Sequence, residues 1–170
     1  MADEPDSGQN SAQSDMIKMY KILATFHAAL FGYEAALLDF IGARGYKTHV
    51  FPKIIEMVAT LKDDIPVVRD IMKADSRFEA MNLWLQLLVE AKIIKEGSVE
   101  QSGDGYDIII KGCSMAFPIH NQMGEQKAIC ANTLVTIAMS QFIDDDKVPI
   151  ISYSDFTSSG SITHVAFKYE

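Results

Sequence analysis

The spacing of apolar residues changes at Ile93, and the order of these changes limits the fold. Before Ile93, apolar residues recur every three or four positions, which is the spacing of amphipathic helices. After it, four segments have the residue types of strands, over 93–101, 106–111, 148–153 and 162–169. Turn sequences join them in pairs at Ser102–Gly105 and Thr157–Gly160, and residues 125–142 return to helical spacing. This order predicts an α+β fold in which N-terminal helices pack with a small antiparallel sheet of two hairpins, with one long helix between them.

The N-terminal half is expected to contain several helices behind an acidic tail. Residues 1–15 carry four acidic residues and no basic one, and we expect them to be a disordered tail. From Met16 the helical spacing continues until Gly42-Ala-Arg-Gly45, where glycine favours a helix end. Further helices are expected over 52–61, over 66–72 and after an N-cap at Asp75 or Ser76. Residues 16–170 are thus expected to form a single α+β ligand-binding domain.

Charge and composition argue against several classes of function. The 170-residue chain has a net charge of −8, from 15 Lys and Arg against 23 Asp and Glu. Nucleic acids and anionic membrane surfaces select basic proteins, so we expect no nucleic-acid partner. Apolar runs such as Leu83–Val89 are shorter than the ~20 residues of a membrane span. Two cysteines without a disulfide pattern fit a reducing compartment, so we expect a cytoplasmic protein without a membrane span.

One local pattern leaves a DNA-binding alternative open. Residues 66–112 are ordered as helix, turn, helix and hairpin, as in a winged-helix DNA-binding regulator. Proteins that bind duplex phosphates carry clustered basic residues, whereas the second helix here offers only Arg77 and Lys92. The acidic balance therefore makes DNA binding the less favoured interpretation.

Two cysteines are the first candidates for a chemical site. Cys113 follows a predicted strand and Cys130 lies in the next predicted helix, with His120 between them and His164 in the last strand. Cysteine thiolates and histidine imidazoles ligate Zn²⁺, so these residues are candidate metal ligands. The alternative is that both cysteines are small buried apolar residues, since no CxxC or HxxxH spacing is present.

Several short motifs of the C-terminal half occur together in one known family. A strand ends in a cysteine at Ile108–Cys113, and a second cysteine opens a long helix at Ala128-Ile-Cys130-Ala. The closing hairpin contains Gly160-Ser-Ile-Thr-His164-Val-Ala-Phe167, where the family tends to have Gly-Asp-x-x-Cys-x-Phe. By these motifs, and by its apolar helices over 26–42 and 49–61, the chain resembles the 4-vinyl reductase (hydrocarbon-binding) domain family, relatives of the TRAPP vesicle-tethering subunits.

The resemblance implies a small α+β domain that binds hydrophobic small molecules, often as a dimer, with cysteine and histidine positions that hold a metal. Cys113 and Cys130 match those positions directly, and His164 stands where a cysteine is usual. Imidazole also ligates Zn²⁺, so this substitution keeps the capacity to bind metal. Asp155 stands near a further cysteine position of the family, and it or His120 would be the fourth ligand.

The first functional hypothesis is a domain that binds an apolar or lipid-like small molecule. Nine Met and nine Phe are many for an acidic chain of this size, and such side chains can line an irregular apolar pocket. The candidates for the pocket walls are Phe31, Leu38, Trp84, Met115 and Phe117. The alternative is that these residues fill the core or a dimer seam.

The second hypothesis is a homodimeric interaction scaffold that resembles a vesicle-tethering subunit. The helix after Met16 is apolar around more than half its circumference, so its own domain and a partner must both cover it. Its apolar residues include Leu23, Ala24, Phe26, Ala28, Leu30 and Phe31. An enzyme is less favoured, because a reductase needs a cofactor site that the sequence does not show.

Overall fold

A computed structural model describes residues 7–116, 120, 129–143 and 146–169 of the chain. The N-terminal half is helical, in α1 (Ser7–Gly45), the π-helix η1 (Tyr46–Val50), α2 (Phe51–Ala59), α3 (Pro66–Ile71) and α4 (Arg77–Glu90). The remaining elements are β1 (Glu96–Ser102), β2 (Gly105–Lys111), α6 (Ala131–Ser140), β3 (Lys147–Ile151), β4 (Asp155–Phe156) and β5 (Ser161–Tyr169). The helix expected over 125–142 corresponds to α6, but α6 begins only at Ala131. Cys130, expected inside this helix, is its N-cap and has an extended backbone, and residues 125–128 lie outside the described part of the chain.

Local sequence explains where two of the helices begin or end. Ser76 is the N-cap of α4, and its Oγ accepts a hydrogen bond of 3.1 Å from the backbone N–H of Glu79. The Glu79 carboxylate in turn accepts one of 2.8 Å from the N–H of Asp75, the residue before the N-cap, in a variant of the capping box. At the end of α1, Gly42 kinks the helix with a φ of +62°, and the helix then continues to Gly45. The predicted cap and the predicted helix end are both confirmed.

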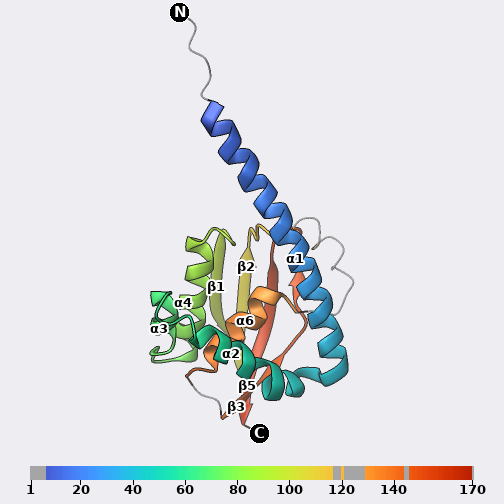
Figure 1. The fold of residues 1–170 in the computed structure, drawn as a ribbon. Helices are drawn as coiled ribbons and strands as arrows, with labels where there is room; N and C mark the ends of the chain where they lie inside the picture. Colours follow the sequence, from blue (N-terminus) through green and yellow to red (C-terminus); the bar gives the residue numbers. More distant parts are fainter. Residues whose placement is uncertain (1–6, 117–119, 121–128, 144–145, 170) are drawn as a thin grey trace, which may run out of the picture.

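The helix α1 begins earlier than the sequence predicted. It begins at Ser7 rather than Met16, so residues 7–15, which we expected to be disordered, are helical. Residues 1–6 of the expected tail lie outside the described residues. The N-terminal part of α1 projects beyond the rest of the domain, while its C-terminal part runs beside the sheet (Figure 1).

One antiparallel sheet joins the two predicted pairs of strands. Its strand order is β1-β2-β5-β3, and β4 also pairs with β5. β1 and β2 are joined by the predicted turn at Ser102–Gly105, where Gly103 has a φ of +58°. β5 pairs with β2 on one side and with β3 and β4 on the other. The α+β fold class is confirmed, and β5 is the strand that unites the sheet.

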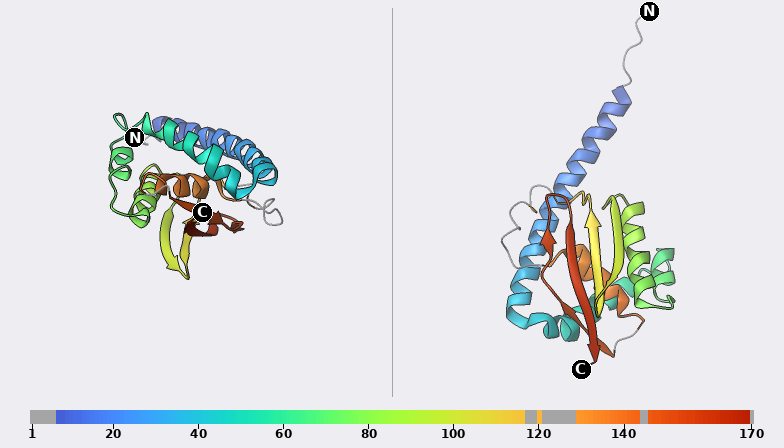
Figure 2. Two further views of the ribbon diagram at one scale, coloured as in Figure 1. Left: turned by 90° about the horizontal axis from the view of Figure 1, so that it is seen from below. Right: turned by 180° about the vertical axis from the view of Figure 1, so that it is seen from behind.

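Helices cover one face of this sheet. The view from behind in Figure 2 shows the strands in front and α6 and α2 behind them, with α1 and α4 on opposite sides. α4 contacts β1, and α1 contacts β3 and α6. Within the described residues, no helix lies over the other face of the sheet (Figure 2).

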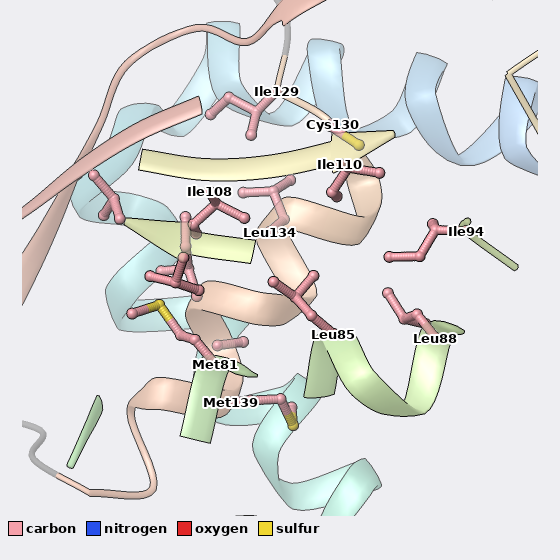
Figure 3. Packing of buried hydrophobic residues seen from close by; sticks show 14 of the residues in the cluster. Met81, Leu85, Leu88, Ile94, Ile108, Ile110, Ile129, Cys130, Leu134 and Met139 are labelled. Carbon is pink, nitrogen blue, oxygen red and sulfur yellow. The ribbon is translucent and has the colours of Figure 1, made fainter. Parts of the chain in front are cut away.

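The hydrophobic core lies between the sheet and the helices (Figure 3). Ile108 and Ile110 on β2 are buried against Leu134 of α6 and Leu85 of α4. Burying such a side chain completely contributes about 1.5–3 kcal/mol. Because side chains alternate along a strand, the neighbours of these isoleucines, including Asp107, point toward the uncovered face.

Candidate functional site

The outward side of α1 carries a continuous line of exposed apolar side chains. Eight of them follow one another at alternating intervals of three and four residues: Met16, Met19, Leu23, Phe26, Leu30, Tyr33, Leu37 and Phe40. Their exposed fractions run from 36% at Leu23 to 88% at Phe40. We call these eight residues the heptad stripe, because the spacing repeats every seven residues, as at the a and d positions of a coiled coil.

Small residues lie beside the heptad stripe on the same exposed side. They are Thr25, Ala29, Gly32 and Ala36. A Cβ atom added at Gly32 would meet nothing within 4 Å, so no contact inside the protein requires glycine there. Exposed charged side chains flank the stripe near its ends, at Lys18 and Asp39. The long middle of this surface is therefore apolar and can be approached closely.

The inward side of α1 is anchored in the domain. Ala24, His27 and Phe31 are buried, and Phe31 packs edge-on against Phe156 with ring centroids 6.2 Å apart. The Nδ1–H of His27 donates to the carbonyl oxygen of Met115 at 3.2 Å. Burial lowers the pKa of His27, so the ring is neutral at pH 7. α1 is thus apolar on two sides, and only one of them is covered by the domain.

A buried carboxyl group lies on the same inward side. Glu34 is mostly buried, and its Oε2 atom has no hydrogen-bond partner among the described residues. Burial raises the pKa of the Glu34 carboxyl to about 8. The Tyr46 hydroxyl lies nearby and donates to the Glu34 backbone oxygen at 3.3 Å. Burial, together with the negative charge that Glu34 can carry, raises the pKa of Tyr46 to about 12.

The apolar character of α1 also meets a criterion for membrane spans. Ser14–Gly42 is long and apolar enough to cross a membrane by length and composition, and 17% of its most apolar window is buried in the domain. Core helices and signal sequences meet the same criterion. Here the inward side packs His27 and Phe31 into the domain, so lipid cannot surround the helix without removing it from the core.

The structure brings the two cysteines close together inside the core. Both are buried free thiols, and Cys113 Sγ lies 3.8 Å from the side-chain nitrogen of Asn132. Burial, with a smaller effect of the neighbouring Cys130, raises the pKa of the Cys113 thiol to about 11. A protonated thiol is neither a nucleophile nor a metal ligand. The interpretation of both cysteines as small buried apolar residues fits this environment.

The other expected zinc ligands do not join the cysteines. Thr163 points into the core, where its hydroxyl lies 2.5 Å from that of Ser154, so its neighbour His164 points to the opposite face of the sheet. There, His164 Nδ1 lies 2.8 Å from the Asp107 carboxylate. The structure therefore does not bring His164 together with Cys113 and Cys130, because successive residues of a strand face opposite ways.

His120 and Asp155 have different surroundings. His120 is buried, and its Nδ1–H donates to the carbonyl oxygens of Thr157 and Gly160 at 3.2 and 3.1 Å. Asp155 is exposed. Across the described part of the chain, no three His, Cys, Asp or Glu side chains gather as metal ligands. The residues proposed for zinc do not fit a zinc site in this arrangement.

The expected pocket residues lie in different parts of the core. Phe31 and Leu38 are on the inward side of α1, and Met115 follows β2. Trp84 is on α4, which lies at the opposite edge of the sheet from α1 (Figure 1). Leu38, Trp84 and Met115 all pack against the core. Phe117 lies outside the described residues. The four described residues thus fill the core, which was the alternative to a pocket.

Two surface cavities are formed by other residues. The first has a volume of about 570 Å³ and lies beside α1, where α4 and β2 end and β1 and β5 begin. Its walls are Tyr20, Val89, Lys92, Ile94, Lys95, Gly112, Cys113, Ser114 and Ser159. The second, of about 530 Å³, is lined by Lys47, Phe51, Pro52, Ile55, Glu56, Gln141 and Phe142. The first cavity combines apolar walls with two lysines and includes Cys113.

Comparisons with known proteins add no relative. No family model, no curated protein and no solved structure matches the chain. The fold and the surface together define an α+β domain that presents a long helix with one uncovered apolar side. The function must be argued from this surface and from the first cavity.

Sequence reasoning recognised the apolar excess of α1 but missed the heptad stripe. The signal is present, because the eight residues keep the three-and-four spacing without a break. It is hidden by a second series with the same spacing, which includes Ala24, His27 and Phe31 and faces inward.

Proposed function

We propose that the protein is an interaction module that associates through the heptad stripe of α1. The carrying observation is the row of eight exposed apolar side chains along one helix face. Their exposed area is about 1,000 Å² if each residue has roughly 200 Å² of surface, whereas large apolar patches on monomers span about 300–600 Å². A surface of this size and regularity marks a site of protein contact. A dimeric scaffold is also what the resemblance to vesicle-tethering subunits implied.

Light scattering during size-exclusion chromatography tests this proposal. We expect the wild-type protein to elute as a dimer at micromolar concentration, and Phe26→Glu to elute as a monomer with an unchanged circular-dichroism spectrum. Met57→Glu is the matched control, since Met57 on α2 is 65% exposed and Phe26 is 64% exposed. A wild-type protein that stays monomeric at 100 µM or so would contradict the proposal. Stable interfaces bury about 800 Å² per partner, and the heptad stripe exposes at least that much, so it should suffice for a dimer at this concentration.

A second candidate function is the binding of an apolar small molecule with an anionic group in the first cavity. Its volume of about 570 Å³ falls within the roughly 300–1,000 Å³ of small-molecule pockets. Val89, Ile94 and Tyr20 supply apolar walls, and the ammonium groups of Lys92 and Lys95 favour a carboxylate or phosphate. This candidate keeps the hypothesis of an apolar ligand and moves its site away from the core residues first expected.

Fluorescence titration with a labelled fatty acid tests the second candidate. We expect saturable binding that Val89→Trp abolishes, because the indole would occupy the cavity from the partly exposed edge of α4. The double variant Lys92→Gln and Lys95→Gln should bind the fatty acid more weakly and bind the corresponding neutral alcohol as the wild type does. Equal binding by all variants would place any bound lipid elsewhere.

A further inference from the structure

We infer that the heptad stripe binds the same stripe of a second copy in the antiparallel direction. The inference rests on the proposed function and adds the identity and direction of the partner. Closed dimers of identical chains are usually related by a two-fold axis, so each residue i that contacts j is matched by a j that contacts i. The question is therefore whether the eight side chains of the heptad stripe pack well against the same eight side chains of an antiparallel second copy.

The eight residues complement one another when the two-fold axis passes Ala28. In two antiparallel helices centred there, residues whose numbers sum to 56 lie at the same height. The stripe then forms complete layers without a residue left over: Met16 with Phe40, Met19 with Leu37, Leu23 with Tyr33, and Phe26 with Leu30 of the second copy. Antiparallel coiled coils place an a residue opposite a d residue in this way, and every layer here does so.

Side-chain size favours this direction over the parallel one. In the antiparallel direction, the layers of Met16, Leu23 and Phe26 each pair one aromatic ring with one aliphatic side chain. Sulfur–aromatic contacts such as Met16 with Phe40 are favourable in their own right. Parallel pairing would instead place Phe26, Tyr33 and Phe40 each against its own copy. Three aromatic pairs would hold the helix axes apart, whereas the antiparallel layers have nearly equal widths.

The small residues beside the stripe fit the same arrangement. Thr25 lies within about 1.5 Å of the height of Gly32 of the second copy, and Ala29 lies next to its own copy near the axis. Gly32 has open space around its Cα inside the protein, so close approach of a partner helix is the contact that would use it. A helical glycine without such a contact only lowers helix stability.

The charges at the ends of the stripe are complementary when it is reversed. Lys18 and Asp39 lie at nearly the same height in the antiparallel pair, whereas parallel pairing sets each beside its own copy. Lys18 also contacts Asp15 of its own helix at 3.1 Å, and both side chains are well exposed. Exposed pairs contribute little energy, so these charges favour one direction without driving association.

A second copy fits this surface better than a lipid surface does. Helices that lie on membranes carry many Lys and Arg on the polar side, and the chain as a whole has a charge of −8. Between Met19 and Leu37 the exposed side of α1 offers mainly small and apolar residues. An area of about 1,000 Å² from one protomer matches the ~800 Å² that each partner contributes to a standard interface.

Distances between spin labels distinguish the direction of pairing. The full chain carries one nitroxide label at Asp39→Cys or at Lys21→Cys, both exposed positions outside the heptad stripe and outside the row of small residues. At about 1.5 Å per residue, antiparallel pairing separates the two Asp39 positions by about 33 Å along the helices and the two Lys21 positions by about 21 Å. Parallel pairing brings both pairs to the interhelix distance of about 10 Å. Unlabelled wild-type protein, whose Cys113 and Cys130 are buried, controls for background labelling.

We expect a dimer with a label distance beyond about 30 Å at Asp39→Cys and a shorter one, beyond about 20 Å, at Lys21→Cys, once the label arms are added to the helix geometry. A dimer with short distances at both positions would overturn the antiparallel inference and leave the proposed association intact. A monomer without dipolar coupling would overturn both. Binding of such a monomer to vesicles of phosphatidylcholine and phosphatidylserine would assign the stripe to lipid.

Discussion

The substitution Glu34→Gln should stabilise the protein strongly at neutral pH and hardly at all in acid. Burial raises the pKa of Glu34 from an ordinary 4.5 to about 8. Below pH 4.5 the carboxyl is protonated in both the folded and the unfolded chain, so it costs no stability there. Between pH 4.5 and 8 only the unfolded chain releases the proton, and folding loses free energy as the pH rises.

The size of this effect follows from the pKa difference. At pH 7 the unfolded chain is favoured by about 1.4 kcal/mol for each of the roughly 2.5 pH units above 4.5, or about 3.5 kcal/mol. Some solvent reaches the group, so we expect 2–3 kcal/mol, or about 5–10 °C in Tm. Glutamine has nearly the shape of the protonated acid and cannot ionise, so the variant should recover this free energy.

Urea denaturation at pH 4, 5.5, 7 and 8, at one fixed protein concentration, measures the effect. The stability difference between Glu34→Gln and wild type should be near zero at pH 4 and grow steadily to pH 8. Glu100→Gln is the control, because Glu100 is exposed and its replacement should change stability by less than about 0.5 kcal/mol at any pH. An equal gain at pH 4 and pH 8 would refute the role of ionisation.

Three further substitutions test other parts of the structure. Gly160→Ala should cost about 2–4 kcal/mol in urea denaturation, because its Cβ would collide with the Ile110 carbonyl and force β5 away from β2. Thr163→Val should cost about 1–3 kcal/mol, since it leaves the buried Ser154 hydroxyl without its 2.5 Å partner. Gly32→Ala should stabilise an isolated protomer by about 0.5–1 kcal/mol but raise the dimer Kd severalfold in sedimentation equilibrium; a tighter dimer would exclude close packing at Gly32.

Local signals predicted the elements of the fold well. The turn at Ser102–Gly105 and the cap at Ser76 depend on a few adjacent residues, so their chemistry can be read from the sequence directly. The order of helices and strands then followed from apolar spacing. The short strand β4 and the π-helix η1 were not predicted, because their formation depends on neighbours that are distant in the sequence.

The candidate site was harder to predict, because it depends on which way side chains face. Cys113 follows the end of β2 and His164 lies within β5, but only the pairing of Asp107 with His164 and the core position of Thr163 show that His164 faces away from the cysteines. α1 poses the same problem, since Phe26 and His27 belong to two series with equal spacing. The sequence could show that both apolar sides of α1 must be buried. It could not show which series packs into the domain and which is left for a partner.

The contacts of α1 also have a consequence for how the chain is made. α1 is synthesised before the segments that cover it: the partner of His27, Met115, comes 88 positions later, and the partner of Phe31, Phe156, comes later still. At roughly 5–20 residues per second, the helix spends on the order of 10 s outside the ribosome with both apolar sides bare. During that interval α1 is the segment most in need of a chaperone. Pairing between neighbouring nascent chains on one messenger RNA would cover the heptad stripe before either domain is complete.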